Sequence, residues 1–208
     1  MDTTQEPRPG RPPGRTLIEP DSKDWTWVLG RPCPECGLDV AGIPREELAE
    51  RLHANTEAWP SVLERGDVRE RPDATTWSAL EYGCHVRDVF ALFGDRLTLM
   101  LAQDDPAFDN WDQDATALAS DYPGQDPAAV AADTVALGRA LASRFHALDG
   151  AAWRRTGRRS DGAAFTVESF ARYLLHDPVH HLHDVGGGVD GTGSGTAGGT
   201  ADTRRVAP

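Results

Sequence analysis

Four stretches of the chain place hydrophobic residues three and four positions apart, the spacing that puts them on one face of an α-helix. The first covers residues 44–65, where Pro60 is expected to kink or break the helix. The second covers residues 77–102 and follows Thr75 and Thr76, either of which can cap its first turn. This second stretch predicts the best-defined helix of the chain.

A long acidic connection separates the second predicted helix from the third. Residues 103–126 contain seven aspartates, and we expect them to form a crossover with a short helix at 111–119. Asp126 and Pro127 provide a cap and a first-turn proline for the third helix, which Gly150 ends. With the fourth helix described next, the pattern predicts an all-α chain of four main helices with a long crossover.

The fourth helix is predicted to begin at Thr166, and it carries most of the histidines in the stretch RYLLHDPVHHLHDV. His176 and His180 lie four positions apart, so both imidazoles can reach one metal ion from the same helix face. Pro178 lies between them, and a bend or an early helix end is expected there. His85 in the second helix could supply a third ligand. The alternative is that these histidines are hydrogen-bonded core residues.

The two ends of the chain differ in composition from the part between them. Residues 1–20 are rich in Pro, Arg and Gly, and residues 186–208 are rich in Gly, so both are expected to be disordered tails around one domain at 21–185. The net charge of -12 disfavours nucleic acid and anionic membranes as partners. The sequence shows no apolar run of the ~20 residues that a membrane span needs, no signal-peptide pattern, and too few cysteines for a disulfide framework. We therefore expect a soluble, cytoplasmic protein.

Cys33 and Cys36 form the motif CPECG near the start of the predicted domain. Such a pair is half of a zinc ribbon, but a structural zinc site needs four ligands and the sequence has no second pair of this kind. A redox role would require the pair to follow a strand and open a helix. We expect a structural turn that is pinned by a metal or packs near the active cleft.

Two motifs together resemble a known family. WSALEYGCHVRDV in the second predicted helix and RYLLHDPVHHLHDV in the last resemble the DinB-like superfamily, over roughly residues 40–185. This superfamily includes mycothiol-dependent maleylpyruvate isomerases and the bacillithiol and mycothiol S-transferases. The resemblance implies a four-helix bundle that holds a divalent metal, zinc or nickel, at one end. It also implies His85, His176 and His180 as ligands, because the family takes one histidine from the second helix and an HxxxH or ExxxH pair from a later one.

Three nitrogen ligands would leave a coordination position open, as in catalytic metal sites. The leading hypothesis is a metal-dependent enzyme that activates a low-molecular-weight thiol such as mycothiol for S-transfer, conjugate addition or isomerisation of a small-molecule electrophile. One alternative is a hydrolase that activates metal-bound water. Another is a non-catalytic metal- or ligand-binding bundle, and a homodimer formed through the bundle faces is compatible with it.

Four further residues are candidates for roles around the metal. Asp88 and His183 could transfer protons, although Asp88 could instead orient an imidazole and His183 could be a fourth ligand. Arg154 and Arg155 belong to a basic run that either binds an anionic thiol or substrate or forms a solvated loop.

Overall fold

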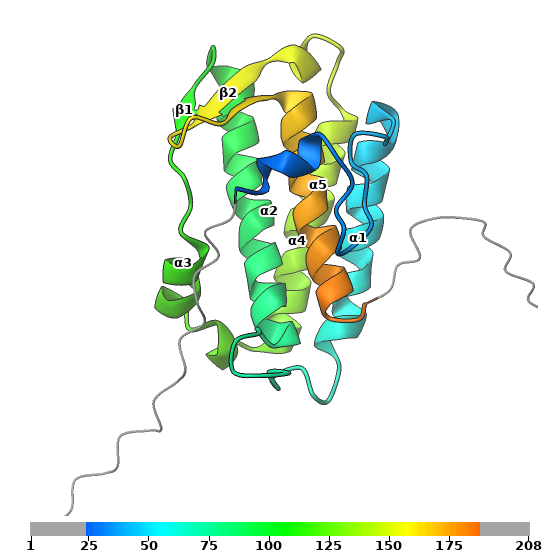
Figure 1. The fold of residues 1–208 in the computed structure, drawn as a ribbon, viewed down its shortest axis with the longest axis vertical. Coiled ribbons are helices and arrows are strands. Elements are labelled where there is room, and N and C mark those ends of the chain that lie inside the picture. The colour runs from blue at the N-terminus through cyan, green and yellow to red at the C-terminus, as the bar shows by residue number, and fades with distance from the viewer. Residues whose placement is uncertain (1–23, 188–208) are drawn as a thin grey trace, which may run out of the picture.

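The computed structural model describes residues 24–187, so the tail expected at 1–20 and nearly all of the tail expected at 186–208 lie outside the described residues. Four long helices form a bundle, and a short helix lies beside it (Figure 1). The bundle helices are α1 (Leu48–Leu63), α2 (Ala79–Ala102), α4 (Pro127–His146) and α5 (Val167–Asp184), and the short helix is α3 (Gln113–Ala119). The predicted four-helix bundle with a long crossover is confirmed.

Helix α2 begins one turn of chain later than the predicted caps. Ser78 is its N-cap and forms a capping box with Glu81, in which the Glu81 backbone N–H donates to Ser78 Oγ (3.3 Å) and the Ser78 N–H donates to Glu81 Oε2 (2.9 Å). Thr75 and Thr76 instead hydrogen-bond to Asp73 in the preceding turn. The prediction of a threonine cap is therefore wrong, because both threonines are held by that aspartate.

The two prolines inside predicted helices do not end them. Helix α1 continues past Pro60 to Leu63, and α5 continues past Pro178 to Asp184. Each proline removes one backbone hydrogen bond, but helix stability in proteins comes mainly from the packing of an apolar face. The α5 residues Leu174, Leu175 and Leu182 around Pro178 are all buried. The expected break at Pro60 and the early end at Pro178 are not found.

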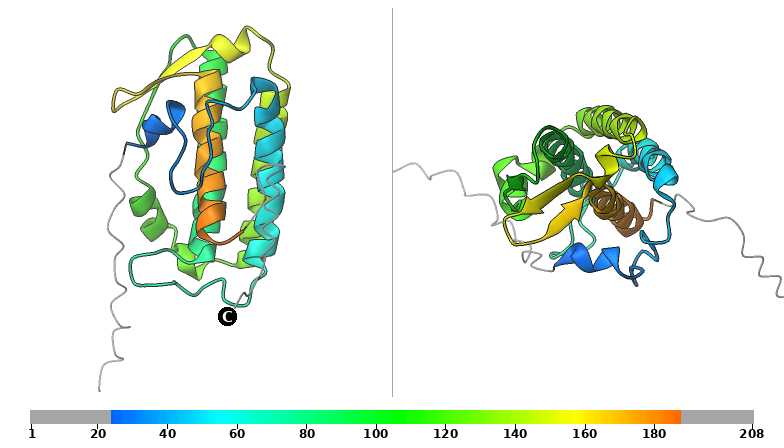
Figure 2. Two further views of the ribbon diagram at one scale, coloured as in Figure 1. Left: turned by 45° about the vertical axis from the view of Figure 1, so that its right-hand side comes forward. Right: turned by 90° about the horizontal axis from the view of Figure 1, so that it is seen from above.

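A small sheet closes one end of the bundle, where only loops were predicted. Strand β1 (Ala107–Phe108) is parallel to β2 (Thr156–Arg159), which is antiparallel to β3 (Ala164–Thr166). The end-on view shows the strands lying across the bundle (Figure 2). Strands of two to four residues are too short to show an alternating hydrophobic pattern, which explains why the sequence did not reveal them.

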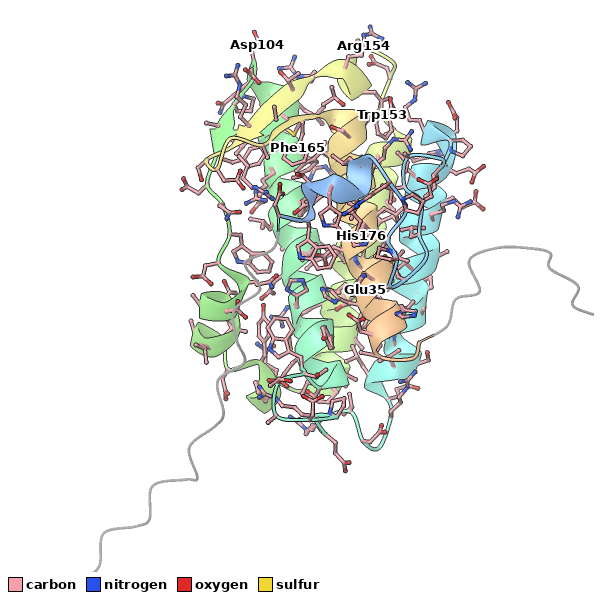
Figure 3. All side chains as sticks on the ribbon, in the orientation of Figure 1. Glu35, Asp104, Trp153, Arg154, Phe165 and His176 are labelled. Atoms are coloured by element: carbon pink, nitrogen blue, oxygen red, sulfur yellow. The ribbon has the colours of Figure 1, made fainter. Side chains whose placement is uncertain are left out.

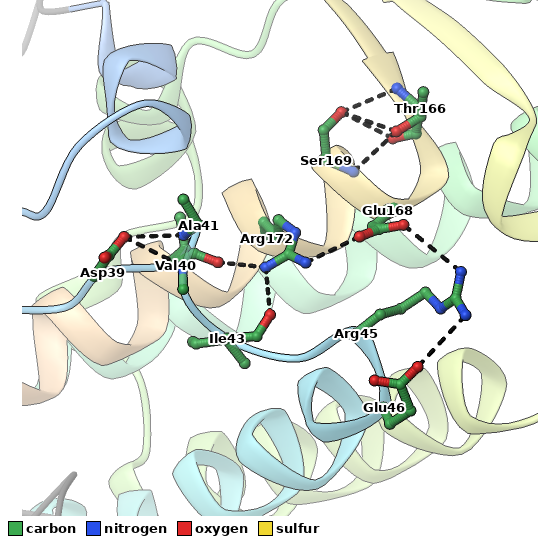
Figure 4. A network of polar contacts seen from close by, with 11 residues as sticks. Asp39, Val40, Ala41, Ile43, Arg45, Glu46, Thr166, Glu168, Ser169 and Arg172 are labelled. Atoms are coloured by element: carbon green, nitrogen blue, oxygen red, sulfur yellow. Dashed lines mark hydrogen bonds and ion pairs between the residues drawn. The ribbon is translucent and has the colours of Figure 1, made fainter.

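The segment before α1 lies along the outer face of α5 (Figure 1). It begins with a 3₁₀ helix, η1 (Trp25–Leu29). Arg172 on α5 fastens its far end by donating hydrogen bonds to the carbonyls of Val40 and Ile43, and its guanidinium also pairs with Glu168 at 2.9 Å (Figure 4). This contact places the CPECG motif against the histidine-bearing helix.

No helix within residues 24–187 is long and apolar enough to cross a membrane.

Candidate metal centres

Two neighbouring stripes of α5 carry side chains that can bind metal. His176 and His180 lie on one stripe, and Asp177 and His181 lie on the next, about 100° around the helix. Figure 3 shows His176 at mid-height of the bundle, well away from the sheet end where Arg154 lies. Each stripe meets a different partner segment, so α5 contributes to two separate groups of candidate ligands.

The first group combines α5 with α2. It consists of His85, Asp177 and His181, whose ligand atoms all lie within 4.8 Å of one another. His85 Nε2 is 3.3 Å from Asp177 Oδ1, and His181 Nε2 is 3.9 Å from the same oxygen. The fully buried His85 ring is flanked by Trp77 and Trp111, with centroids at 5.5 and 5.3 Å.

The unsatisfied polar atoms of this group fit a bound cation. Both ring nitrogens of His85 and the Oδ1 atom of Asp177 are buried and have no hydrogen-bond partner among the described residues. Burying such atoms without a partner is costly, and most buried polar atoms in proteins are paired. Burial would raise the pKa of Asp177, but the imidazoles around it, His85 first, lower it to about 2. An ionised carboxylate and two imidazoles are suitable ligands for zinc or nickel.

The second group combines α5 with the CPECG motif. Cys33, Cys36, His176 and His180 have ligand atoms within 4.8 Å of one another, and Cys33 Sγ is 3.6 Å from His180 Nδ1. Burial lowers the pKa of His176 to about 4, helped by the neighbouring His180, and burial raises the pKa of the Cys36 thiol to about 11. Without a metal, this imidazole and this thiol are therefore both neutral at pH 7.

The structure divides the predicted ligands between these two groups. His85 lies with Asp177 and His181, whereas His176 and His180 lie with the cysteines. The sequence contains two overlapping pairs with the same four-residue spacing, HxxxH at 176 and 180 and DxxxH at 177 and 181. Spacing alone does not show which pair faces α2. The DxxxH pair is the signal that makes Asp177 and His181 candidates alongside the HxxxH pair.

The two predicted proton-transfer residues lie outside both groups. Asp88 Oδ2 accepts a hydrogen bond from the Tyr122 hydroxyl at 2.6 Å, and Asp88 Oδ1 accepts one from Arg87 Nε at 2.8 Å. The side chain of His183 is 57% exposed, and its closest acidic neighbour is Asp184 at 3.9 Å. Asp88 therefore holds α2 to the crossover, and His183 faces solvent.

The two predicted cofactor-binding arginines hold backbone carbonyls at the sheet end of the bundle. Arg154 donates to the Gly150 carbonyl at 2.6 Å, and Arg155 donates to the Gln103 carbonyl at 2.6 Å. Neither lines the cavity beside the metal-binding groups. A later residue of the same basic run, Arg159, does line it.

A cavity of about 120 Å³ adjoins both groups. Trp25 and Trp111 line it together with Arg159 from the basic run and with Arg96, which the sequence analysis did not assign to the site. Burial lowers the pKa of Arg96 to about 10, which leaves the guanidinium charged at neutral pH. Burial also disfavours the charge of Arg159, but its contacts with Asp161 and other neighbours raise the pKa overall. The cavity thus has aromatic walls, a charged Arg96, and an Arg159 whose charge is paired with Asp161 at 2.8 Å.

Comparison with known proteins agrees with this architecture. A family model described as the DinB superfamily matches residues 48–185, from the start of α1 to the end of α5. The chain belongs to the DinB superfamily. The DinB match begins after the CPECG motif, so Cys33 and Cys36 lie outside it. The expected superfamily is confirmed, and the match names the superfamily without naming a branch within it.

A solved structure shares the DinB bundle. YfiT from Bacillus subtilis is described as a probable metal-dependent hydrolase with an unusual four-helix bundle topology. It is 19% identical in sequence, and the match covers 67% of this chain and 82% of YfiT with a TM-score of 0.61. At this level of identity the likeness shows a common fold. No curated protein matches the chain significantly.

Proposed function

We propose that this DinB-superfamily protein is a metal-dependent enzyme in which His85, Asp177 and His181 hold the metal beside the cavity. The observation that carries the proposal is the pair of buried atoms His85 Nε2 and Asp177 Oδ1, which lie 3.3 Å apart and form no hydrogen bond with each other or with another described residue. Three ligands leave a coordination position open, as in catalytic rather than structural sites. A bound zinc or nickel ion would lower the pKa of a thiol or water molecule and so generate a nucleophile.

Asp184 keeps His181 oriented for this role. Its Oδ2 atom lies 3.0 Å from His181 Nδ1, and the opposite ring nitrogen of His181 faces Asp177. A carboxylate bound to one nitrogen of a ligating histidine fixes the tautomer and makes the other nitrogen a better ligand. His85 enters the group from α2, so the site also requires the packing of α2 against α5.

The charge of the group favours an anionic nucleophile. One carboxylate neutralises half of the charge of a divalent ion, and the two histidines are neutral when they bind it. The site therefore keeps one positive charge, which stabilises a thiolate or a hydroxide. Arg96 adds positive charge along the cavity wall, whereas Arg159 is paired with Asp161 at 2.8 Å, so the reacting partner is expected to be a small electrophile with an anionic group.

Two nucleophiles are compatible with this geometry. The first is a low-molecular-weight thiol such as mycothiol, which would support S-transfer, conjugate addition or isomerisation, as the family resemblance implies. The second is water, which would make the protein a hydrolase. Two histidines and a carboxylate are also the ligands of zinc hydrolases of the thermolysin type, and the description of YfiT is that of a probable hydrolase.

Turnover with and without thiol separates the two reactions. Zinc- or nickel-loaded protein is assayed with carboxylate-bearing electrophiles plus mycothiol, and with carboxylate-bearing aryl esters without thiol. We expect His85→Ala and Asp177→Asn to lower kcat/KM by at least ~100-fold, because each removes a ligand and even the loss of an outer-shell partner costs 10–100-fold. His183→Ala, at an exposed position of the same helix, is the matched control and should retain activity. Unchanged metal content and turnover in His85→Ala would refute the proposal.

A further inference from the structure

One sulfur–nitrogen distance in the cysteine–histidine group matches that of a tetrahedral zinc site. With Zn–S bonds of ≈ 2.3 Å and Zn–N bonds of 2.0–2.1 Å, a sulfur and a nitrogen on one ion should lie about 3.6 Å apart. Cys33 Sγ and His180 Nδ1 are 3.6 Å apart. The other ligand atoms of Cys36 and His176 are within 4.8 Å of these two and of each other. Small side-chain movements would therefore bring all four onto one ion.

The backbone of the CPECG motif turns so that both thiols face α5. The Gly37 N–H donates to the Cys33 carbonyl, and the Cys33 N–H donates to the Leu38 carbonyl, each at 2.9 Å. Gly37 has a φ of 74°, a left-handed conformation that glycine adopts without steric cost. The turn thus presents Cys33 and Cys36 as a pair, and α5 presents the two histidines opposite them.

The histidines of this group are already arranged as ligands. His176 Nε2 is buried without a hydrogen-bond partner within residues 24–187. His180 directs Nδ1 toward Cys33, while its Nε2 lies 3.3 Å from Glu35 and 3.7 Å from Asp184. Ligating histidines usually pair their second nitrogen with a carboxylate in this way. Glu35 lies between the two cysteines in sequence, so the motif supplies both a ligand pair and this carboxylate.

We propose that Cys33, Cys36, His176 and His180 form a structural zinc site that fastens the N-terminal segment to α5. Two thiolates and two imidazoles in tetrahedral geometry are typical of structural zinc, and no position remains open for a substrate. The two thiolates balance the charge of the ion, so the occupied site is neutral and can be buried at low cost. It differs in this respect from the three-ligand group on the next stripe of α5.

The zinc site would also shape the neighbouring cavity. Trp25 in η1 lies against His176 and His180, with ring centroids at 5.5 and 5.2 Å, and it forms part of the cavity wall. Fixing the CPECG segment therefore fixes Trp25. The structural zinc thus affects the proposed active site only by positioning Trp25, and it takes no part in the reaction.

Cobalt substitution of the full-length protein tests this site without an activity assay. Cobalt bound by thiolates gives a charge-transfer absorption that cobalt bound only by nitrogen and oxygen does not give. We expect the band in the wild type and in His85→Ala, and its loss in the double variant Cys33→Ser and Cys36→Ser. The matched control is Cys84→Ala, because Cys84 contacts the Tyr122 carbonyl at 3.7 Å and lies outside the group. The band should persist in this control.

Zinc content provides the second measurement. We expect about two equivalents of zinc in the wild type. The double cysteine variant should lose the zinc of the cysteine–histidine group, and His85→Ala should lose the zinc held by His85, Asp177 and His181. Cobalt binding to the reduced wild type without a thiolate band would overturn the zinc site, and so would a Cys33–Cys36 disulfide in place of metal. If the double variant does not fold, X-ray absorption spectroscopy of the wild-type zinc protein shows whether sulfur binds the zinc. Sulfur at about 2.3 Å supports the site, and nitrogen and oxygen neighbours alone refute it.

Discussion

A buried asparagine links the helix that carries the ligands to α1. Asn55 is only 2% exposed, and its Nδ2 donates to the Pro178 carbonyl at 3.0 Å while its Oδ1 accepts from Trp59 Nε1 at 3.2 Å. Asn55→Ala removes both bonds and leaves the Trp59 N–H buried without an acceptor. An unsatisfied buried donor costs ≈ 1–3 kcal/mol and a lost hydrogen bond about 1 kcal/mol. We expect the free energy of unfolding to fall by about 2–4 kcal/mol.

Urea denaturation followed by circular dichroism measures this loss, provided that the m-value is unchanged. Ser61→Ala is the matched control on the same helix, because Ser61 is exposed and bonds only the Ala58 carbonyl. It should change stability by less than about 0.5 kcal/mol. In a Trp59→Phe background the loss caused by Asn55→Ala should be smaller, because the indole N–H is absent. A loss below about 0.5 kcal/mol in the wild-type background would show that this link does not stabilise the fold.

Two further predictions concern α2 and α4. Burial would raise the pKa of Glu81, but hydrogen bonds from Arg71 and Ser78 lower it below its usual 4.5. Arg71→Ala should therefore lower the free energy of unfolding by about 2–4 kcal/mol at pH 7. This loss should shrink as the pH falls below 4.5 and Glu81 is protonated. Urea denaturation at several pH values measures the loss, and a loss that does not change with pH would contradict the prediction. Gly138→Ala should lower the midpoint of thermal unfolding, because a Cβ would overlap the Thr56 side chain and overpacking costs about 1–3 kcal/mol. At Gly94 there is room for a Cβ, so Gly94→Ala should raise the midpoint of thermal unfolding. Equal shifts of the midpoint in the two variants would contradict the close approach of α4 to α1.

The long helices could be predicted because each buries an apolar stripe that repeats along many residues. The helix breaks expected at Pro60 and Pro178 were wrong, because the sequence shows a helix breaker there but not the packing that outweighs it. The three short strands were not predicted either. The pairing of β1 with β2 joins residues about fifty positions apart, such as Ala107 and Arg158, and such contacts leave no local pattern. Strands β2 and β3 pair locally, but they are too short to show an alternating pattern.

The site was predictable in kind but not in detail. The sequence indicated metal ligands on the second and last helices, and the structure places candidate ligands on both. The rotation of α5 about its axis decides whether His176 and His180 or Asp177 and His181 face α2. That rotation depends on the packing of the whole helix. The partner of Cys33 could not be predicted for a different reason, because His180 lies 147 residues away in the chain.

We expect the catalytic metal to bind to His85, Asp177 and His181. Anomalous diffraction from crystals of the metal-loaded protein, measured at the absorption edge of the metal, locates the ion directly. A peak is expected about 2.0–2.2 Å from His85 Nε2, Asp177 Oδ1 and a nitrogen of His181. A single peak shared by His85, His176 and His180 would contradict this assignment.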